Sequence, residues 1–313
     1  MTLKKKYLIG SLLFVLVFTL LLVIASLFDL EISNILAGGG FRAGAYYSTN
    51  VFGRIFEYIG SWPIFILGIF ACLVLMHKVY TFKNFVRYLA LGFIVAILIL
   101  SNKLYGDTFE YICQNHDILY VYKSTYSKVI LWVMSIITTT LLVFYYRNVD
   151  EEKNNNLVRF ALVVLFTFAF YLVISIIKGP VGRMRYRAMN SINDFSFFTN
   201  WYEISNAKEL VAKEGYSVIK DGFKSFPSGH TFSAGVTYTL ICMPYVFTKF
   251  NTKKWKVFWY VVPVIYTGIV GLSRIVVGAH FLSDVLVGGT IAYLASELAK
   301  YIFFIKKIEI CKK

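Results

Sequence analysis

Three short groups of residues in this sequence carry side chains suited to binding an anion and moving a proton. The first group holds two cations, Lys178 and Arg185, at the end of an apolar run. The second is the segment 226–231, Phe-Pro-Ser-Gly-His-Thr, which contains His230. The third combines a hydroxyl, a cation, a second histidine and a carboxylate, namely Ser273, Arg274, His280 and Asp284. These types and spacings predict one anion site flanked by two histidines.

The cations and the second group would bind the anion together. Arginine presents a planar fork that matches phosphate oxygens, while lysine adds a compact point charge. Ser228 and the backbone N–H groups of Gly229 and His230 lie where an apolar helix is predicted to begin. Free N–H groups and the helix dipole favour anions at such a position. Glycine also lets a ligand approach the backbone closely.

The two histidines could divide the chemistry between them. His280 and Asp284 are four residues apart and share a face if a helix has begun there. A carboxylate bonded to one imidazole nitrogen fixes the tautomer and leaves the other nitrogen as a nucleophile. His230 comes from a different loop and would serve as a general acid for phosphoryl transfer.

Each of these residues alone also has a structural interpretation. A single histidine at an interface is more often structural, and a Lys or Arg at a helix end often only sets topology. His77 and His116 fit that interpretation, because no suitable partners surround them. The joint presence of two histidines, a carboxylate and three cations at the ends of apolar runs favours a functional site.

The composition is that of a membrane protein. Of the 313 residues 58% are hydrophobic, and the mean hydropathy is +0.65, whereas soluble domains are about 45–50% apolar. The net charge of +15 could indicate a nucleic-acid partner, but the basic residues form no single module. We therefore assign the charge to membrane topology and an anionic substrate. The four cysteines show no metal-ligand spacing.

The apolar runs predict an all-α, polytopic bundle of about eight membrane spans, since a spanning helix needs about 20 mostly apolar residues. The predicted spans are 7–28, 62–80, 88–106, 129–146, 157–178, 231–250, 257–275 and 283–304. The first follows three lysines and is too long for an ordinary signal peptide, so we interpret it as an uncleaved anchor.

Lysine and arginine in the loops predict the orientation, because they are enriched on the cytoplasmic side. With both termini in the cytoplasm, the inside segments carry Lys4, Lys5, Lys6, Lys78, Lys83, Arg87, Arg147, Lys153, Arg159, Lys249, Lys253, Lys254, Lys256, Lys306, Lys307, Lys312 and Lys313. The first two outside loops hold fewer. The basic residues of 178–230 and Arg274 then lie outside. They are an exception to the cytoplasmic enrichment of positive charge, and this exception suggests that they have a function. This arrangement predicts a multi-pass protein of the cell membrane with an extracytoplasmic site.

At these residues the chain resembles the type 2 phosphatidic acid phosphatase superfamily, which includes vanadium haloperoxidases and glucose-6-phosphatase. The family pattern is Lys-x6-Arg-Pro, then Pro-Ser-Gly-His, then Ser-Arg-x5-His-x3-Asp. Lys178 and Arg185 match the first element, and the second and third match in full over 227–230 and 273–284. The departure is Tyr186, where the family usually has proline. It leaves Arg183 and Arg187 as alternatives for the role of Arg185.

The resemblance implies a division of the chain and a role for each residue. Residues 88–313 would form a six-span phosphatase core, with the motifs in 178–284, and residues 1–87 an N-terminal extension whose loop 29–61 could lie beside the site. His280 would form a phosphohistidine, Asp284 would orient it, and His230 would act as general acid and then base. The phosphate would be held by Lys178, Arg185, Ser228, Gly229, Ser273 and Arg274. The resemblance implies a metal-independent hydrolase with no cofactor.

The implied substrate is a lipid phosphomonoester or diphosphate that reaches the site from the membrane. Candidates are phosphatidate, phosphatidylglycerol phosphate, undecaprenyl diphosphate and lipid A-like phosphates, with membrane lipids as surroundings and no nucleic acid. Two rival functions remain open. A phosphotransferase would pass the phosphoryl group to an acceptor other than water. A non-enzymatic transporter of anionic lipids is disfavoured, because transporters place charged sites near the bilayer midplane.

Overall fold

The computed structural model describes residues 3–42, 44–80, 88–147 and 155–306, and these are helical without any strand. The predicted inside charges Lys83, Arg87, Lys153, Lys307, Lys312 and Lys313 lie outside the described residues, and so do the side chains of Lys4, Lys5, Lys6 and Arg147. The fold class predicted from the sequence, an all-α polytopic bundle, is confirmed.

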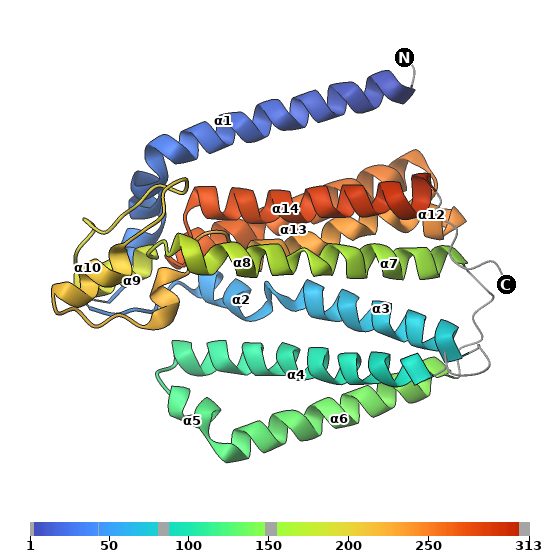
Figure 1. Ribbon diagram of the computed structural model, residues 1–313, viewed down its shortest axis with the longest axis horizontal. Coiled ribbons are helices and arrows are strands. Elements are labelled where there is room, and N and C mark those ends of the chain that lie inside the picture. The colour runs from blue at the N-terminus through green and yellow to red at the C-terminus, as the bar shows by residue number, and fades with distance from the viewer. Residues whose placement is uncertain (1–2, 43, 81–87, 148–154, 307–313) are drawn as a thin grey trace.

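The long elements lie side by side in one bundle (Figure 1). In chain order they are α1 (Leu3–Ala37), α2 (Val51–Ile59), α3 (Trp62–Tyr80), α4 (Leu89–Asn115), α5 (Leu119–Lys123), α6 (Thr125–Arg147), α7 (Asn155–Ala169), α8 (Tyr171–Val181), α9 (Tyr186–Ile192), α10 (Ala207–Lys213), α11 (Gly229–Gly235), α12 (Met243–Val246), α13 (Lys253–Val276) and α14 (Leu282–Lys300). A 3-10 segment, η4 (Val236–Cys242), joins α11 to α12, and α14 continues as a short π-helix over Tyr301–Ile305.

Seven helical stretches among the described residues are long and apolar enough to cross a membrane. They are Leu12–Gly40, Val51–Tyr80, Leu89–Asn115, Thr125–Tyr146, Asn155–Ile192, Lys253–Val276 and Leu282–Ile305. They overlap seven of the eight predicted spans, with longer boundaries because polar turns such as 107–115 continue the helix beyond the apolar run.

The prediction of one unbroken helix at 231–250 is wrong. The hydroxyls of Thr237 and Thr239 donate to the carbonyls of Ala234 and Val236, three residues earlier. Such bonds compete with the α-helical ladder, and here the segment tightens into the 3-10 helix η4. Pro244, at the start of α12, further divides the segment.

The divided segment still crosses the bundle. The start, α11, packs against α8 and α14, while α12 packs against α7 at the other end. Seven α residues, seven 3-10 residues and four α residues extend over about 30 Å, which matches the hydrocarbon core of a bilayer. The eighth crossing is therefore made by irregular helix, which is covered by α7, α13 and α14.

The predicted motifs meet at one end of the bundle. In Figure 1 this is the end that carries α9 and α10. The helices α8 and α13 end there, and α11 and α14 begin there, so their termini bring the three groups of residues together. The N-terminal helix α1 reaches the same end, and α1 turns at Phe28 through a non-helical residue.

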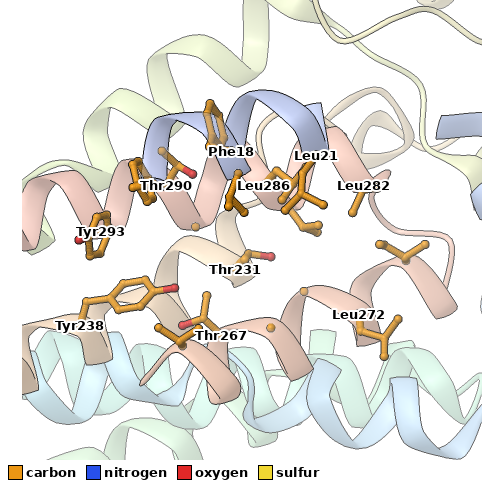
Figure 2. Close-up of a pocket in the computed structure, with 18 of the residues that line it drawn as sticks. Phe18, Leu21, Thr231, Tyr238, Thr267, Leu272, Leu282, Leu286, Thr290 and Tyr293 are labelled. Atoms are coloured by element: carbon orange, nitrogen blue, oxygen red, sulfur yellow. The ribbon is translucent and has the colours of Figure 1, made fainter. Parts of the chain in front are cut away.

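An apolar groove of about 560 Å³ lies between α1, α13 and α14 (Figure 2). Phe18 and Leu21 of α1 form one wall, and Leu272 and Leu286 line the opposite helices. Its inner surface includes Thr231 of α11. The lining is almost entirely apolar, so the groove has the chemistry to hold a hydrocarbon chain.

Candidate active site

His280 lies in the short turn between α13 and α14, next to Asp284. Its Nδ1 atom is 3.6 Å from Oδ2 of Asp284, which is longer than a hydrogen bond. The side chain of His280 is almost completely buried. Burial, together with the positive charges of Lys178 and Arg185, lowers the pKa of His280 to about 3 against the opposing effect of Asp284. The imidazole is therefore neutral at pH 7, as a nucleophile must be.

Asp284 is fixed by several donors. It is the third residue of α14, and its Oδ2 atom accepts a hydrogen bond from the backbone N–H of Phe281, which caps the helix. The hydroxyl of Ser225 also donates to Oδ2, and Nη1 of Arg183 donates to Oδ1 at 2.7 Å. The carboxylate beside His280 therefore has a defined position.

Arg183 holds this carboxylate and does not face a vacant anion position. Besides Asp284, its guanidinium donates to Asp29 Oδ2 at 3.0 Å, to Ser283 Oγ at 2.8 Å and to the carbonyl of Thr199 at 2.8 Å. Its carbon Cζ lies 4.2 Å from the centre of the Phe281 ring. With these contacts made, the guanidinium of Arg183 is bound to protein groups, which argues against Arg183 as an alternative to Arg185.

Arg185 keeps the backbone conformation that the family pattern requires although Tyr186 replaces proline. Its φ of −75° and ψ of 149° are extended, as for a residue that precedes proline. Tyr186 occupies the first position of α9, where proline is favoured. The guanidinium pairs with Asp221 at 2.9 Å. Burial alone would raise the pKa of Asp221, but Arg185 and Arg187 bring it to about 2.

Arg274 and Arg187 share one carboxylate, that of Glu57 on α2. Nη2 of Arg274 lies 3.0 Å and Nη1 of Arg187 lies 2.9 Å from Oε1 of Glu57. All three side chains are buried. Arg187 also packs on the rings of Tyr46 and Tyr47. Nε and Nη1 of Arg274 have no hydrogen-bond partner among the described residues. Arg274 therefore keeps two donor nitrogens that no described residue uses.

The Pro-Ser-Gly-His segment starts α11. The hydroxyl of Ser228 accepts from the backbone N–H of Thr231 and so caps the helix. The backbone N–H of Ser228 donates to the carbonyl of Asp284. A Cβ on Gly229 would lie 3.4 Å from Nζ of Lys178, so the backbone of Gly229 lies directly beside the ammonium group. On α14, a Cβ on Gly288 would overlap the carbonyl oxygen of Ser228.

His230 stands beside the other histidine, with a ring from α4 against it. The ring of Tyr111 lies 5.2 Å from the ring of His230 in an edge contact. Nε2 of His230 has no partner among the described residues. Burial lowers the pKa of His230, and the neighbouring Arg274 and His280 lower it further. Nothing in the sequence motifs indicated Tyr111.

The structure thus brings together most of the predicted site residues. The exception is Ser273, whose hydroxyl donates to the carbonyl of Val270 within α13. Sequence reasoning missed Glu57 and Asp29, which lie in the predicted N-terminal extension. A signal was available, because lone carboxylates in apolar surroundings must be paired.

Comparison with known proteins agrees with the geometry. The PAP2 superfamily model matches residues 156–307. The phosphatidylglycerophosphatase B of Bacillus subtilis (strain 168) is 32% identical over 92 residues, or 29% of this chain and 45% of that protein. The probable diacylglycerol pyrophosphate phosphatase 1 of Schizosaccharomyces pombe (strain 972 / ATCC 24843) is 33% identical over 132 residues, or 39% of this chain and 45% of that protein.

Each match spans less than half the length of the relative. No solved structure matches this chain. The family match covers every residue of the three motifs, from Lys178 to Asp284. Residues 156–307 of this chain therefore match the PAP2 superfamily, and this part of the chain carries the predicted site residues.

Proposed function

We propose that this protein is an integral-membrane lipid phosphate phosphatase that works through a phosphohistidine. The observation that carries the proposal is the pairing of two features at one end of the bundle. His280 is neutral and has a fixed carboxylate beside Nδ1, and Arg274 offers two donors without a protein partner among the described residues. A nucleophile next to a cation with unpartnered donors suits phosphoryl transfer.

In the first step, Nε2 of His280 attacks phosphorus while Nδ1–H points toward Asp284. The bond between phosphorus and the leaving oxygen breaks, and His230 gives that oxygen a proton. A bound phosphate dianion offsets the surrounding cations, so its arrival raises the pKa of His230 from its depressed value in the empty site. The proton donor is thus charged when the substrate binds.

In the second step, His230 takes a proton from water, and the water oxygen attacks the phosphohistidine. The N–P bond breaks, inorganic phosphate leaves, and His280 returns to the neutral form. Lys178, Arg185 and Arg274 stabilise the charge that develops on the phosphoryl oxygens, with the backbone of Gly229 and the Ser228 cap beside them. Loss of one such donor costs about 2.7–4 kcal/mol in comparable sites.

The substrate class follows from the relatives and the membrane setting. One relative is named for phosphatidylglycerophosphate and the other for diacylglycerol pyrophosphate. A lipid phosphomonoester or diphosphate could keep its chains in the bilayer while its headgroup reaches the ends of α8 and α13. We place the site on the extracytoplasmic face of the cell membrane and both termini in the cytoplasm. We also propose that residues 88–313 form the six-span core.

A phosphotransferase would use the same first step, and a lipid transporter would need no histidine. The test is phosphate release by the purified protein in detergent, with phosphatidate, phosphatidylglycerol phosphate, undecaprenyl diphosphate or a lipid A-like phosphate and no added acceptor. We expect release that persists in EDTA, is inhibited by vanadate and is lost in His280→Ala. Release only with an acceptor would indicate the transferase, and strict Mg²⁺ dependence would refute the mechanism.

A further inference from the structure

We propose that Glu57, from outside the segment matched by the family, is a positioning residue for the phosphate site. It would hold Nη2 of Arg274 so that the other donors of the guanidinium stay available to the substrate, and it would set the net charge that the substrate meets. The inference rests on the proposed function for the identity of the anion.

The contacts of Glu57 separate its two oxygens. Oε1 accepts from both arginines, Arg274 at 3.0 Å and Arg187 at 2.9 Å. Oε2 accepts from Nδ2 of Asn115 on α4 at 3.0 Å. One oxygen thus anchors the carboxylate to a neighbouring helix, and the other accepts from Arg187 and from Nη2 of Arg274. The Nε and Nη1 donors of Arg274 are left over.

The backbone holds Glu57 rigidly against the end of α13. The side chain of Asn50 accepts from the N–H of Gly53 and caps α2. A Cβ on Gly53 would lie 2.2 Å from Cγ1 of Val277, just beyond Arg274, and one on Gly60 would lie 3.0 Å from Val270. These glycines allow α2 to pack closely against the last turn of α13, which carries Arg274. The carboxylate can therefore position the guanidinium with little freedom.

The charges at this end of the bundle are nearly balanced. The described cations at the site are Lys178, Arg183, Arg185, Arg187 and Arg274, and the carboxylates that face them are Asp29, Glu57, Asp221 and Asp284. Asp29 and Asp284 are committed to Arg183, and Asp221 is half-exposed. Glu57 is thus the buried carboxylate that offsets the open cation Arg274, and it limits how tightly an anion binds.

Two substitutions separate the effects of charge and position. Glu57→Gln keeps the shape and removes the charge. Oδ1 of Asn115 has no partner among the described residues, so the Asn115 amide can turn and accept from the new amide group. Glu57→Ala removes both the charge and the hydrogen bond that positions Arg274. Glu297→Gln is the matched control, because Glu297 pairs with Lys300 at the opposite end of α14 from Asp284.

The experiment measures orthovanadate binding by thermal shift and, separately, kcat and KM with p-nitrophenyl phosphate. We expect Glu57→Gln to bind vanadate about 10-fold more tightly, since one opposing charge is gone. We expect Glu57→Ala to lose about 100-fold in kcat, as when an oriented donor is misplaced. Glu297→Gln should match the wild type in both measurements.

A purely structural Glu57 would give a different pattern. Both variants would then lower thermal stability, while the folded fraction kept wild-type vanadate affinity and kcat. That result overturns the proposal. If Glu57→Ala fails to fold, an unchanged vanadate affinity in Glu57→Gln is enough to overturn it. Vanadate binding needs no turnover. A wild type that binds vanadate without releasing phosphate would refute the hydrolase and leave the role of Glu57 intact.

Discussion

Replacing Arg183 with methionine should strongly destabilise the protein. Arg183 donates to two buried carboxylates, Asp29 and Asp284, and to Ser283 and the carbonyl of Thr199. Methionine fills much of the volume but leaves both carboxylates without their cation. Breaking a buried ion pair by removing one partner costs about 3–5 kcal/mol. That is a large fraction of a typical stability of about 5–15 kcal/mol.

The assay is SDS unfolding in mixed micelles, followed by tryptophan fluorescence, for the wild type, Arg183→Met, Asp29→Asn and the double variant. If the pair is as tightly coupled as its 3.0 Å distance indicates, the double variant should be less destabilised than the sum of the singles, by about 0.5–3 kcal/mol. A loss below about 1 kcal/mol in Arg183→Met, or strict additivity, would refute the reasoning that this cluster depends on charge pairing.

Three further predictions concern chemistry, pH and topology. His230→Ala should slow lipid substrates with poor leaving groups by about 10²–10⁴-fold but spare p-nitrophenyl phosphate, and equal losses on both would argue against a general acid. The pKa of His280 is about 3 in the folded protein against 6.5 for a free histidine, so between these values only the unfolded chain takes up the proton. The free energy of unfolding should therefore fall as the pH drops from 6.5 toward 3, and His280→Asn should weaken that dependence in unfolding titrations; an unchanged slope would mean that another group carries it. A reporter inserted at Asn206 should read as extracytoplasmic and one after Lys313 as cytoplasmic, and a cytoplasmic Asn206 would reverse the sidedness.

The motif residues meet at one end of the bundle because they lie at helix ends. Lys178, His230, Arg274 and Asp284 each stand where an apolar run begins or stops, and antiparallel spans bring such ends together. The sequence could also distinguish spans from loops, since about 20 apolar residues are needed for each.

What the sequence could not predict depends on contacts between distant segments. Glu57 and Asp29 belong to no motif, and their arginine partners lie 130 or more residues away in the chain. The roles of Arg183 and Arg187 depend on these carboxylates and could not be separated from that of Arg185. The division of 231–250 arises from threonine hydroxyls that donate to carbonyls three residues earlier. A hydropathy profile does not detect such hydrogen bonds.

The wide separation of these pairs has a consequence for biosynthesis. Glu57 is made 130 residues before Arg187 and 217 residues before Arg274. At a synthesis rate of about 5–20 residues per second, roughly 10–40 s pass between the synthesis of Glu57 and that of Arg274, its second cationic partner. A carboxylate in an apolar setting takes up a proton when no cation is near. Glu57 can therefore complete its ion pairs only after Arg274 has been synthesised, and until then an apolar setting favours the neutral form of its carboxyl group.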